Sequence, residues 1–343
     1  MSNFLLSKKM EYRFLGNSGL KVSAISLGTW FNCKDIESYK SVIQAAYLSG
    51  INYFDTAESY EYGNVEKILG VAISDLKIPR EDIVISTKLY FGSREKIYES
   101  NDPSLCNSKG LSRKHVIEGM RASLKRLQLD YVDVVFAHRY DFEVPLEEIF
   151  PGFNDLIEKG LAFYWGTSEW PAERIVKANE LCYKLGLVSP ITEQAQYNIL
   201  VKDRVENEYK SLFDNTKMGL TAWSPLCGGI LTGKYVDGIP KGSRGEKDMP
   251  FYMKERFERL CFNNEVKEKR IKQFELLKKI CEELNCTMSQ LALAWVLYNK
   301  NVSTAIIGAT SKVQIMENVN SIGILKKLNL EIMKKIDEIF EEN

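Results

Sequence analysis

Short apolar runs alternate with longer amphipathic segments along most of this chain. Runs of about four to eight residues rich in Val, Ile and Leu are typical of buried strands, whereas a repeat of roughly 3.6 residues indicates helices. The segments that fit strands are 22–28, 51–55, 83–88, 132–138, 162–168, 191–194, 220–224 and 303–307. The segments that fit helices are 37–48, 65–76, 112–127, 146–158, 172–185, 266–284, 287–298 and 331–340. Ser112 is placed to cap one helix, and Thr287 with Gln290 has the pattern of a capping box at another.

This alternation of strands and helices predicts a parallel (β/α)8 barrel, or TIM barrel, rather than an open sheet. A doubly wound dinucleotide-binding sheet would need a G-x-G-x-x-G turn after its first strand, and residues 28–30 (Gly-Thr-Trp) do not match it. Ahead of the barrel, residues 12–15 and 20–22 flank the turn residues 16–19, which indicates an antiparallel hairpin. We therefore predict an α/β TIM barrel with an N-terminal β-hairpin and extra C-terminal helices.

The composition is that of an ordinary globular protein, with 343 residues, 45% hydrophobic and 27% charged. Single barrel domains are commonly this long, so we expect residues 11–343 to form one domain after a flexible leader at 1–10. Lys plus Arg and Asp plus Glu both number 46, so the charge balance gives no reason to expect nucleic acid as a partner. No apolar stretch approaches the roughly 18 residues of a membrane span.

Cysteine and histidine usage points away from metal binding. The chain has seven scattered cysteines without a C-x-x-C pair, and only two histidines, which argues against a zinc site. Unpaired cysteines are typical of a reducing compartment, so we expect a cytoplasmic protein. His115, early in a predicted helix, is interpreted as structural.

Three polar side chains stand at the ends of successive predicted strands. Asp55 ends the segment 51–55, Lys88 ends 83–88, and His138 ends 132–138. Tyr60 follows Asp55 by five residues. Because a parallel barrel brings the C-terminal ends of its strands to one face, we expect these four side chains to meet. An acid, a phenol, an amine and an imidazole in one pocket would form a proton-delivery device.

The expected chemistry follows from these four groups. Asp55 would pair with Lys88 and keep it charged, and the Lys88 ammonium would lower the pKa of the Tyr60 phenol. His138 would donate a hydrogen bond to a substrate carbonyl. Taken singly, Tyr60 is typical of an amphipathic surface tyrosine, and the other groups of ordinary strand-end residues. Their joint position at successive strand ends favours the catalytic interpretation.

Two later segments have features of a phosphate-binding site. Residues 223–226 lead into the Gly-rich stretch 227–234, whose backbone N–H groups could hold an anion, with charge added by Lys234 and Arg244. Residues 307–311 join the last predicted strand to a helix, and barrels often bind phosphate after strands seven and eight. Each segment alone would also fit an ordinary turn.

Two long insertions, 89–110 and 225–264, leave from strand C-termini, where long loops are usually functional or mobile. The first contains aromatic residues that we expect to wall the pocket together with two aromatic residues near the first strand end. These pocket-wall candidates are Tyr90, Phe91, Tyr98, Trp30 and Phe31. Aromatic walls favour a non-ionic carbonyl substrate.

Together the motifs resemble the aldo-keto reductase superfamily, from about Tyr12 to Phe340. Asp-Thr-Ala-x-x-Tyr at 55–60, Ser-Thr-Lys at 86–88 and the strand before His138 are similar to that family's catalytic tetrad. Four longer strings resemble the branch of the voltage-gated potassium channel beta subunits and related bacterial aldehyde reductases. They are Gly-Leu-Ser-Arg-Lys-His-Val-Ile-Glu-Gly at 110–119, Arg-Leu-Gln-Leu-Asp-Tyr-Val-Asp-Val-Val-Phe-Ala at 126–137, Tyr-Trp-Gly-Thr-Ser at 164–168 and Gly-Lys-Tyr at 233–235.

The resemblance implies an enzyme that reduces a small aldehyde or ketone by hydride transfer from NADPH, with NADH less favoured, and with Tyr60 as the proton donor. It implies the tetrad Asp55, Tyr60, Lys88 and His138 as catalytic residues. It further implies cofactor contacts from Thr29, Trp30, Asp55, Ser168, Gln194, Trp223, Ser224, Leu226, Cys227, Lys234, Arg244, Gly308, Thr310, Gln314, Glu317 and Asn318, with Trp223 stacked on the nicotinamide.

Three departures from the family pattern bear on function. The channel beta subunits carry Asn at the position of His138, and the more active reductases carry His, which favours catalysis. Those subunits also carry Arg at the position of Glu169, and many superfamily members carry Arg at Gln314, which leaves the choice between NADPH and NADH open. The alternative function is a redox-sensing regulatory subunit with slow turnover, a homotetramer that docks on a membrane channel.

Overall fold

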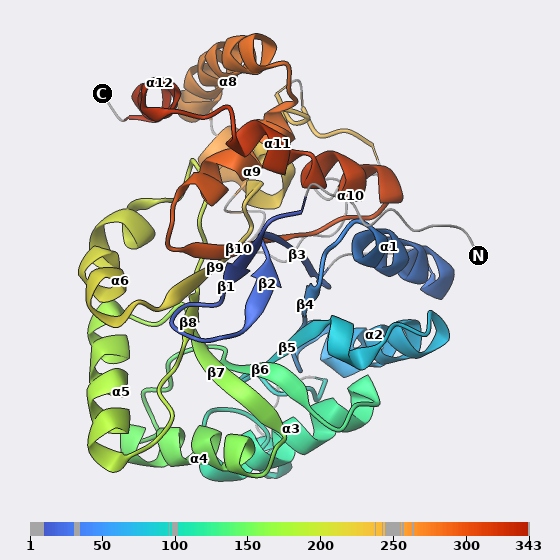
Figure 1. Ribbon diagram of the computed structural model, residues 1–343, viewed down its shortest axis with the longest axis vertical. Helices are drawn as coiled ribbons and strands as arrows, with labels where there is room; N and C mark the ends of the chain where they lie inside the picture. The colour runs from blue at the N-terminus through green and yellow to red at the C-terminus, as the bar shows by residue number, and fades with distance from the viewer. Residues whose placement is uncertain are drawn as a thin grey trace.

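The computed structural model describes residues 10–30, 35–95, 97, 102–236, 238–241, 243, 255, 257–262 and 264–341. The leader expected at 1–10 therefore lies outside the described residues, apart from Met10. Eight parallel strands close into a barrel in the order β10-β3-β4-β5-β6-β7-β8-β9 (Figure 1). The strands are β3 Ile25–Gly28, β4 Tyr53–Asp55, β5 Val84–Leu89, β6 Val132–Ala137, β7 Ala162–Ser168, β8 Thr192–Gln194, β9 Gly219–Trp223 and β10 Val302–Ile307.

All neighbouring barrel strands are parallel, including β10 with β3, which closes the ring. A two-stranded antiparallel hairpin, β1 Tyr12–Phe14 and β2 Lys21–Ser23, precedes the barrel. The predicted TIM barrel with an N-terminal hairpin and extra C-terminal helices is therefore confirmed.

The hairpin covers the amino end of the barrel. The Arg13 guanidinium donates to the carbonyl oxygen of Val302, the first residue of β10, at 2.7 Å. Apolar side chains from the hairpin and from the barrel strands form one buried cluster at this end. Its members are Leu15, Val22, Tyr53, Val84, Val134, Phe136 and Ile191. Polar groups inside the barrel are consequently confined to its carboxyl end.

The first predicted strand, 22–28, is wrong as a single element, because the chain changes partners at Ala24. The Ala24 N–H donates to Glu11 in the hairpin, whereas its carbonyl accepts from Ala305 of β10. The residues on both sides of Ala24 are buried, so the apolar pattern runs through the break without a signal.

Helices follow most barrel strands and cover the outside of the ring. They are α1 Ile36–Leu48, α2 Asn64–Asp75, α3 Arg113–Leu127, α4 Leu146–Glu158, α5 Ala172–Leu185, α6 Lys210–Thr216, α8 Asn264–Leu284, α9 Met288–Tyr298, α10 Lys312–Val319, α11 Ser321–Leu325 and α12 Leu330–Phe340. Ser112 caps α3, and Thr287 with Gln290 forms the predicted capping box of α9. The sequence pattern does not predict α6 or α11, which are too short to show a helical repeat.

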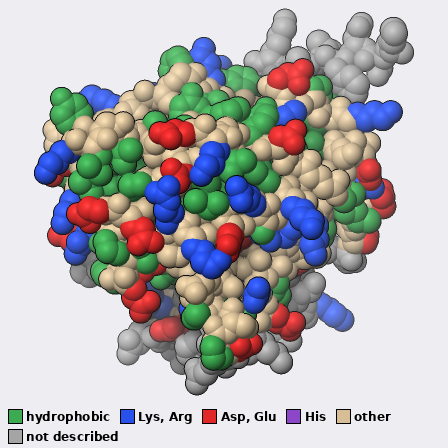
Figure 2. Space-filling model, turned by 90° about the horizontal axis from the view of Figure 1, so that it is seen from below, with side chains coloured by type: hydrophobic (Ala, Val, Ile, Leu, Met, Phe, Trp, Pro, Cys, Tyr) green, Lys and Arg blue, Asp and Glu red, His purple; other side chains and the backbone are tan. Residues whose placement is uncertain are grey.

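The last helices extend the barrel on one side. Figure 1 shows α8 and α12 together at the end of the molecule that is opposite α3 and α4. The Gln273 side chain of α8 donates to the carbonyl oxygen of Ile339 in α12 at 2.7 Å, which ties the two helices together. The face in Figure 2 has acidic and basic side chains interspersed, in keeping with the balanced charge. Within the described part of the chain, no helix is long and apolar enough to cross a bilayer.

Candidate active site

The strands place polar side chains above the apolar plug by simple alternation. Residues two apart on a strand face the same side, so inward-facing Tyr53 is followed by Asp55, and inward-facing Val84 is followed by Ser86 and then Lys88. Asp55 lies beside Ser86 in the register of β4 and β5. The Ser86 hydroxyl donates to Asp55 Oδ1 at 2.7 Å. The carboxyl ends of these strands therefore present a carboxylate, a hydroxyl and an ammonium to one another.

Lys88 lies at the centre of this group. Its side chain has no solvent exposure, and its Nζ donates to Asp55 Oδ2 at 2.5 Å. The same nitrogen donates to the Thr56 carbonyl oxygen at 2.7 Å and to the Tyr60 hydroxyl at 3.1 Å. The predicted pairing of Asp55 with Lys88 is present, and the ammonium uses its third proton on the phenol.

Burial and charge act in opposite directions on these groups. Burial lowers the pKa of Lys88, but the Asp55 carboxylate and the Tyr60 oxygen outweigh burial and raise the pKa above its usual value. Lys88 is therefore a stable ammonium. Burial raises the pKa of Tyr60, and the nearby Lys88 ammonium offsets this only in part. The expectation that Lys88 lowers the pKa of Tyr60 below its ordinary value is thus wrong for this structure, because desolvation of the phenolate dominates.

His138 is the residue after β6, and its ring completes the group. Its ring centroid lies 6.1 Å from that of Tyr60 and 5.0 Å from that of Phe91, both in edge-on geometry. Burial, followed by the positive charges of Lys88 and Arg139, lowers the pKa of His138 well below its ordinary value. The imidazole is therefore neutral at pH 7. Its Nδ1 is buried and has no hydrogen-bond partner among the described residues.

Several predicted cofactor contacts lie directly against this group. The Trp30 ring stacks on that of Tyr60, with centroids 5.8 Å apart. The Gln194 amide donates to Asp55 Oδ1 at 3.1 Å, and the Ser168 hydroxyl donates to the Gln194 carbonyl at 2.9 Å. Thr29 is buried, and its hydroxyl donates to the Asp55 carbonyl at 2.9 Å.

Trp223 is held by a residue outside the predicted set. Its indole N–H donates to Glu169 Oε1 at 2.8 Å, and the same oxygen accepts from the Gln196 N–H at 2.7 Å. The other Glu169 oxygen forms an ion pair with Arg204. Glu169 directly follows Ser168 and adopts a left-handed backbone, with φ of 57°. A carboxylate therefore fixes the orientation of Trp223 at the end of β9.

The turn after β9 brings the Gly-rich stretch and Lys234 together. Cys227, Gly228 and Gly229 all have positive φ, the backbone conformation found in anion-binding concavities. A Cβ added at Gly229 would lie only 3.0 Å from the Lys234 Nζ, so the glycine leaves room for the ammonium. Ser224 and Leu226 precede this turn and are half-buried. Arg244, predicted as a further contact, lies outside the described residues.

The remaining predicted contacts lie on the β10–α10 connection. Gly308 is exposed, with open space where a side chain would stand. The Thr310 N–H donates to Gln314 Oε1 at 2.8 Å at the start of α10. Glu317 accepts from the Thr287 hydroxyl at 2.8 Å, and Asn318 is buried. No measured contact joins these residues to the tetrad, so they form a second group with the turn after β9 still to be connected by a ligand.

Glu58 is a structural residue of the site that the sequence patterns did not identify. Its buried Oε1 accepts from the Tyr90 N–H at 2.8 Å, the Gly92 N–H at 2.9 Å and His115 Nε2 at 3.1 Å. Glu58 thereby fixes the start of the 89–110 insertion, which carries Phe91 against His138. The interpretation of His115 as structural agrees with this contact. Of the other expected pocket-wall residues, Phe31 and Tyr98 lie outside the described residues.

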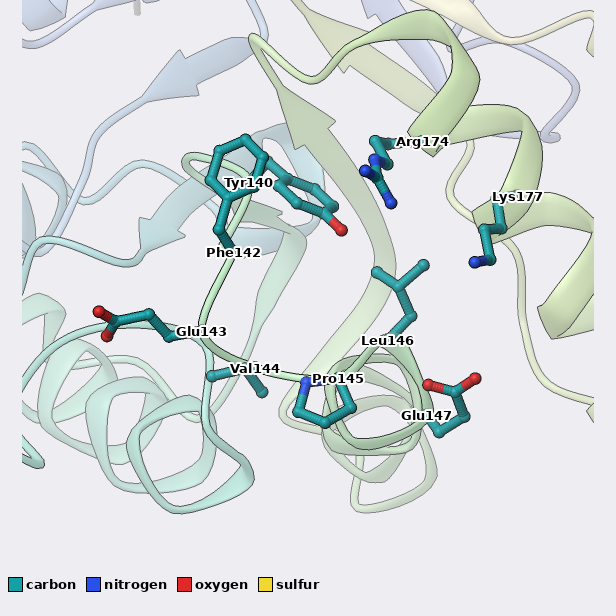
Figure 3. Close-up of a pocket in the computed structure, with 9 residues that line it drawn as sticks. All are labelled: Tyr140, Phe142, Glu143, Val144, Pro145, Leu146, Glu147, Arg174 and Lys177. Atoms are coloured by element: carbon teal, nitrogen blue, oxygen red, sulfur yellow. The ribbon is translucent and has the colours of Figure 1, made fainter.

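A separate cavity of about 310 Å³ lies beside the site, between the β6–α4 loop and α5 (Figure 3). In Figure 3 the Tyr140 hydroxyl and the Arg174 guanidinium lie on one side of it, and Leu146 lies between them and Glu147. None of the predicted catalytic or cofactor residues lines this cavity. Its mixed charges carry no acid–base group comparable to the Tyr60–Lys88 pair.

The barrel and this group of side chains define a class of protein that comparison with known sequences identifies. The chain belongs to the aldo/keto reductase family, whose sequence model matches residues 24–341.

Three proteins provisionally named voltage-gated potassium channel subunit beta are similar over nearly the whole length. That of Schizosaccharomyces pombe is 47% identical, covering 97% of this chain and 94% of the relative. Those of Oryza sativa and Arabidopsis thaliana are 42% and 43% identical, covering 97% of both chains in each comparison.

Proposed function

We propose that the protein reduces an aldehyde or ketone to the alcohol with NADPH, and that Tyr60 donates the proton. The observation that carries this proposal is the contact between the Tyr60 hydroxyl and a fully buried Lys88 ammonium, 3.1 Å apart. An ammonium held by a buried carboxylate stabilises the negative charge that develops when a phenol gives up its proton. Membership of the aldo/keto reductase family supports the same assignment.

The residues around the site fit a dinucleotide. Trp223 is oriented by Glu169 at the end of β9, where its ring would stack on a nicotinamide. The left-handed turn at 227–229 with the Lys234 ammonium, and the open backbone at Gly308, suit the phosphates. Ser168 and Gln194 would contact the nicotinamide amide near Asp55. When bound, NADPH supplies the hydride that reduces the carbonyl carbon.

The side chains of the protein supply the remaining steps. His138, neutral at pH 7 and with a buried unpartnered Nδ1, orients the carbonyl oxygen by a hydrogen bond. Tyr60 keeps its proton until that oxygen becomes an alkoxide, since its own pKa is raised. It then donates the proton, and Lys88 stabilises the phenolate that remains. Trp30 and Phe91 flank this position and exclude water.

The test is a rate measurement of NADPH oxidation by the purified full chain. Short aliphatic aldehydes, methylglyoxal and aromatic aldehydes are supplied in turn, and the series is repeated with NADH. We expect carbonyl-dependent oxidation of NADPH with production of the matching alcohol. NADPH bound without any carbonyl-dependent oxidation across this panel would overturn the proposal.

A second candidate function is favoured by the similar proteins that are provisionally named potassium channel beta subunits. In this alternative, a cytoplasmic homotetramer with bound cofactor regulates a membrane channel, and turnover is incidental. Copurification with a voltage-gated potassium channel, together with negligible carbonyl reduction, would favour it. Light scattering of the purified protein tests the tetramer directly.

A further inference from the structure

The end of α8 brings two cysteines of this chain together. The Cys286 N–H donates to the Cys281 carbonyl at 2.9 Å, and the Asn285 N–H donates to the Glu282 carbonyl at 3.1 Å. Asn285 lies between them in the left-handed region, with φ of 50°. These two hydrogen bonds and the left-handed residue define a Schellman motif, in which the side chains at the positions of Cys281 and Cys286 contact each other.

The backbone geometry is compatible with a bond between the two sulfur atoms. In the hydrogen bond of 2.9 Å between Cys286 and Cys281, the carbonyl oxygen lies about 2.4 Å and the amide nitrogen about 1.5 Å from the respective Cα atoms. The two Cα atoms are therefore within about 7 Å of each other, the limit for a disulfide. Both cysteines are free thiols in the structure.

The two thiols differ in environment. Cys281 is buried, with 4% exposure, whereas Cys286 is partly exposed. The Cys281 S–H, and then the Lys327 ammonium, lower the pKa of Cys286 against the opposing effect of burial. Lys327 is held in place by donating to the Leu284 carbonyl at 2.6 Å. The exposed thiol is thus the nucleophile, and the buried thiol lies beside it as the resolving group.

We propose that Cys281 and Cys286 form a redox-active dithiol that a peroxide converts to an intramolecular disulfide. The Cys286 thiolate attacks one peroxide oxygen, the O–O bond breaks, and a sulfenic acid forms while hydroxide leaves and takes up a proton. The Cys281 sulfur then attacks the sulfenic sulfur. The S–S bond forms, the S–O bond breaks, and the hydroxyl leaves with the Cys281 proton as water. Two thiols are oxidised and one peroxide is reduced to two waters. This site is independent of the proposed carbonyl reduction.

The chain contains a matched control for this site. Cys182 occupies the same position at the end of α5, where the Leu187 N–H donates to its carbonyl at 2.9 Å and Gly186 is left-handed. There the contacting residue is Leu187 rather than a second cysteine. Cys182 is fully buried, and burial raises the pKa of its thiol to about 12. The same helix ending without a partner thiol should therefore not respond.

The experiment treats the reduced full-length protein with a small excess of hydrogen peroxide, then unfolds it, alkylates it and digests it with trypsin. Both cysteines fall in one tryptic peptide, 280–300, and Cys182 falls in 178–184. We expect 280–300 to become unlabelled and two hydrogens lighter, and dithiothreitol to restore double labelling. Peptide 178–184 should stay labelled throughout. In Cys281→Ala, dimedone should trap a sulfenic acid on Cys286 at least about tenfold faster than on Cys182.

Two results would overturn the proposal. One is a 280–300 peptide that stays doubly alkylated after the peroxide has been consumed. The other is a disulfide that forms no faster in the folded protein than in urea, because the folded turn would then contribute nothing. Cys286→Ala should abolish the lighter peptide and leave Cys281 labelled, which distinguishes this disulfide from one to another cysteine.

Discussion

Tyr60→Phe is the most informative single change because it removes only the hydroxyl. The ring keeps its stacking with Trp30 and its edge contact with His138. Lys88 loses a hydrogen bond of 3.1 Å but keeps Asp55 at 2.5 Å and the Thr56 carbonyl at 2.7 Å. The ammonium therefore remains paired in the variant, and the fold should tolerate the change.

The expected effects on stability and on rate differ in size. Loss of one hydrogen bond to a charged group costs about 1.5–3 kcal/mol at most, and less here because Lys88 keeps two partners. Loss of the general acid costs about 10²–10⁴-fold in kcat, or roughly 3–5 kcal/mol in the barrier. The variant should thus be folded and bind NADPH nearly as tightly as the wild type, while its turnover almost disappears.

The assay compares kcat, cofactor affinity and urea unfolding of the wild type, Tyr60→Phe and a control, Tyr12→Phe. Tyr12 also loses one hydroxyl hydrogen bond, to the Gly50 carbonyl at 2.8 Å, but it lies on the hairpin at the opposite end of the barrel. Tyr12→Phe should keep its kcat. A kcat for Tyr60→Phe within about tenfold of the wild type would refute the assignment of Tyr60 as the proton donor.

Three further predictions concern the groups around Tyr60. Lys88→Met leaves the buried Asp55 carboxylate without its cation, so urea unfolding should show a loss of about 3–5 kcal/mol, partly recovered in Lys88→Met/Asp55→Asn; a loss below about 1 kcal/mol would contradict the buried pair. Glu169→Ala frees the Trp223 indole and should weaken NADPH binding about five- to tenfold in a fluorescence titration, whereas Glu169→Gln keeps an acceptor and should restore most of it. If Glu169 only repelled the phosphates, both variants would bind more tightly. Because the pKa of His138 is depressed, the imidazole stays neutral as pH falls, and kcat/KM should be level between about pH 6 and 8; a step near pH 6.5 would show a titrating His138.

Strand alternation and strand ends made most of the architecture predictable from the sequence. The carboxyl ends of the apolar runs carry Asp55, Lys88 and His138, and a closed barrel has to bring them to one face. The same alternation could have identified Ser86, which lies two residues before Lys88 on the same side of β5 and donates to Asp55. The position of Ala24 could not be predicted, because its change of partner depends on hydrogen bonds to Glu11 and to Ala305, which are distant from each other in the chain.

Electrostatic consequences were less accessible to sequence reasoning. The pKa of Tyr60 depends on how completely the ring is buried, which only the packing of Trp30 and the neighbouring loops determines. Likewise, Glu58 and Glu169 look like ordinary polar residues in the sequence. Their roles arise from backbone N–H groups and an indole that the fold brings to them.

The most direct test of carbonyl reduction follows the hydride itself. Purified protein is loaded with NADPH deuterated at nicotinamide C4 and given an aldehyde in a single turnover, and the alcohol is analysed by mass spectrometry. We predict one deuterium on the carbinol carbon of the alcohol, at a rate that collapses in Tyr60→Phe. Oxidised cofactor without deuterium in the alcohol, or no oxidation at all, would contradict the account.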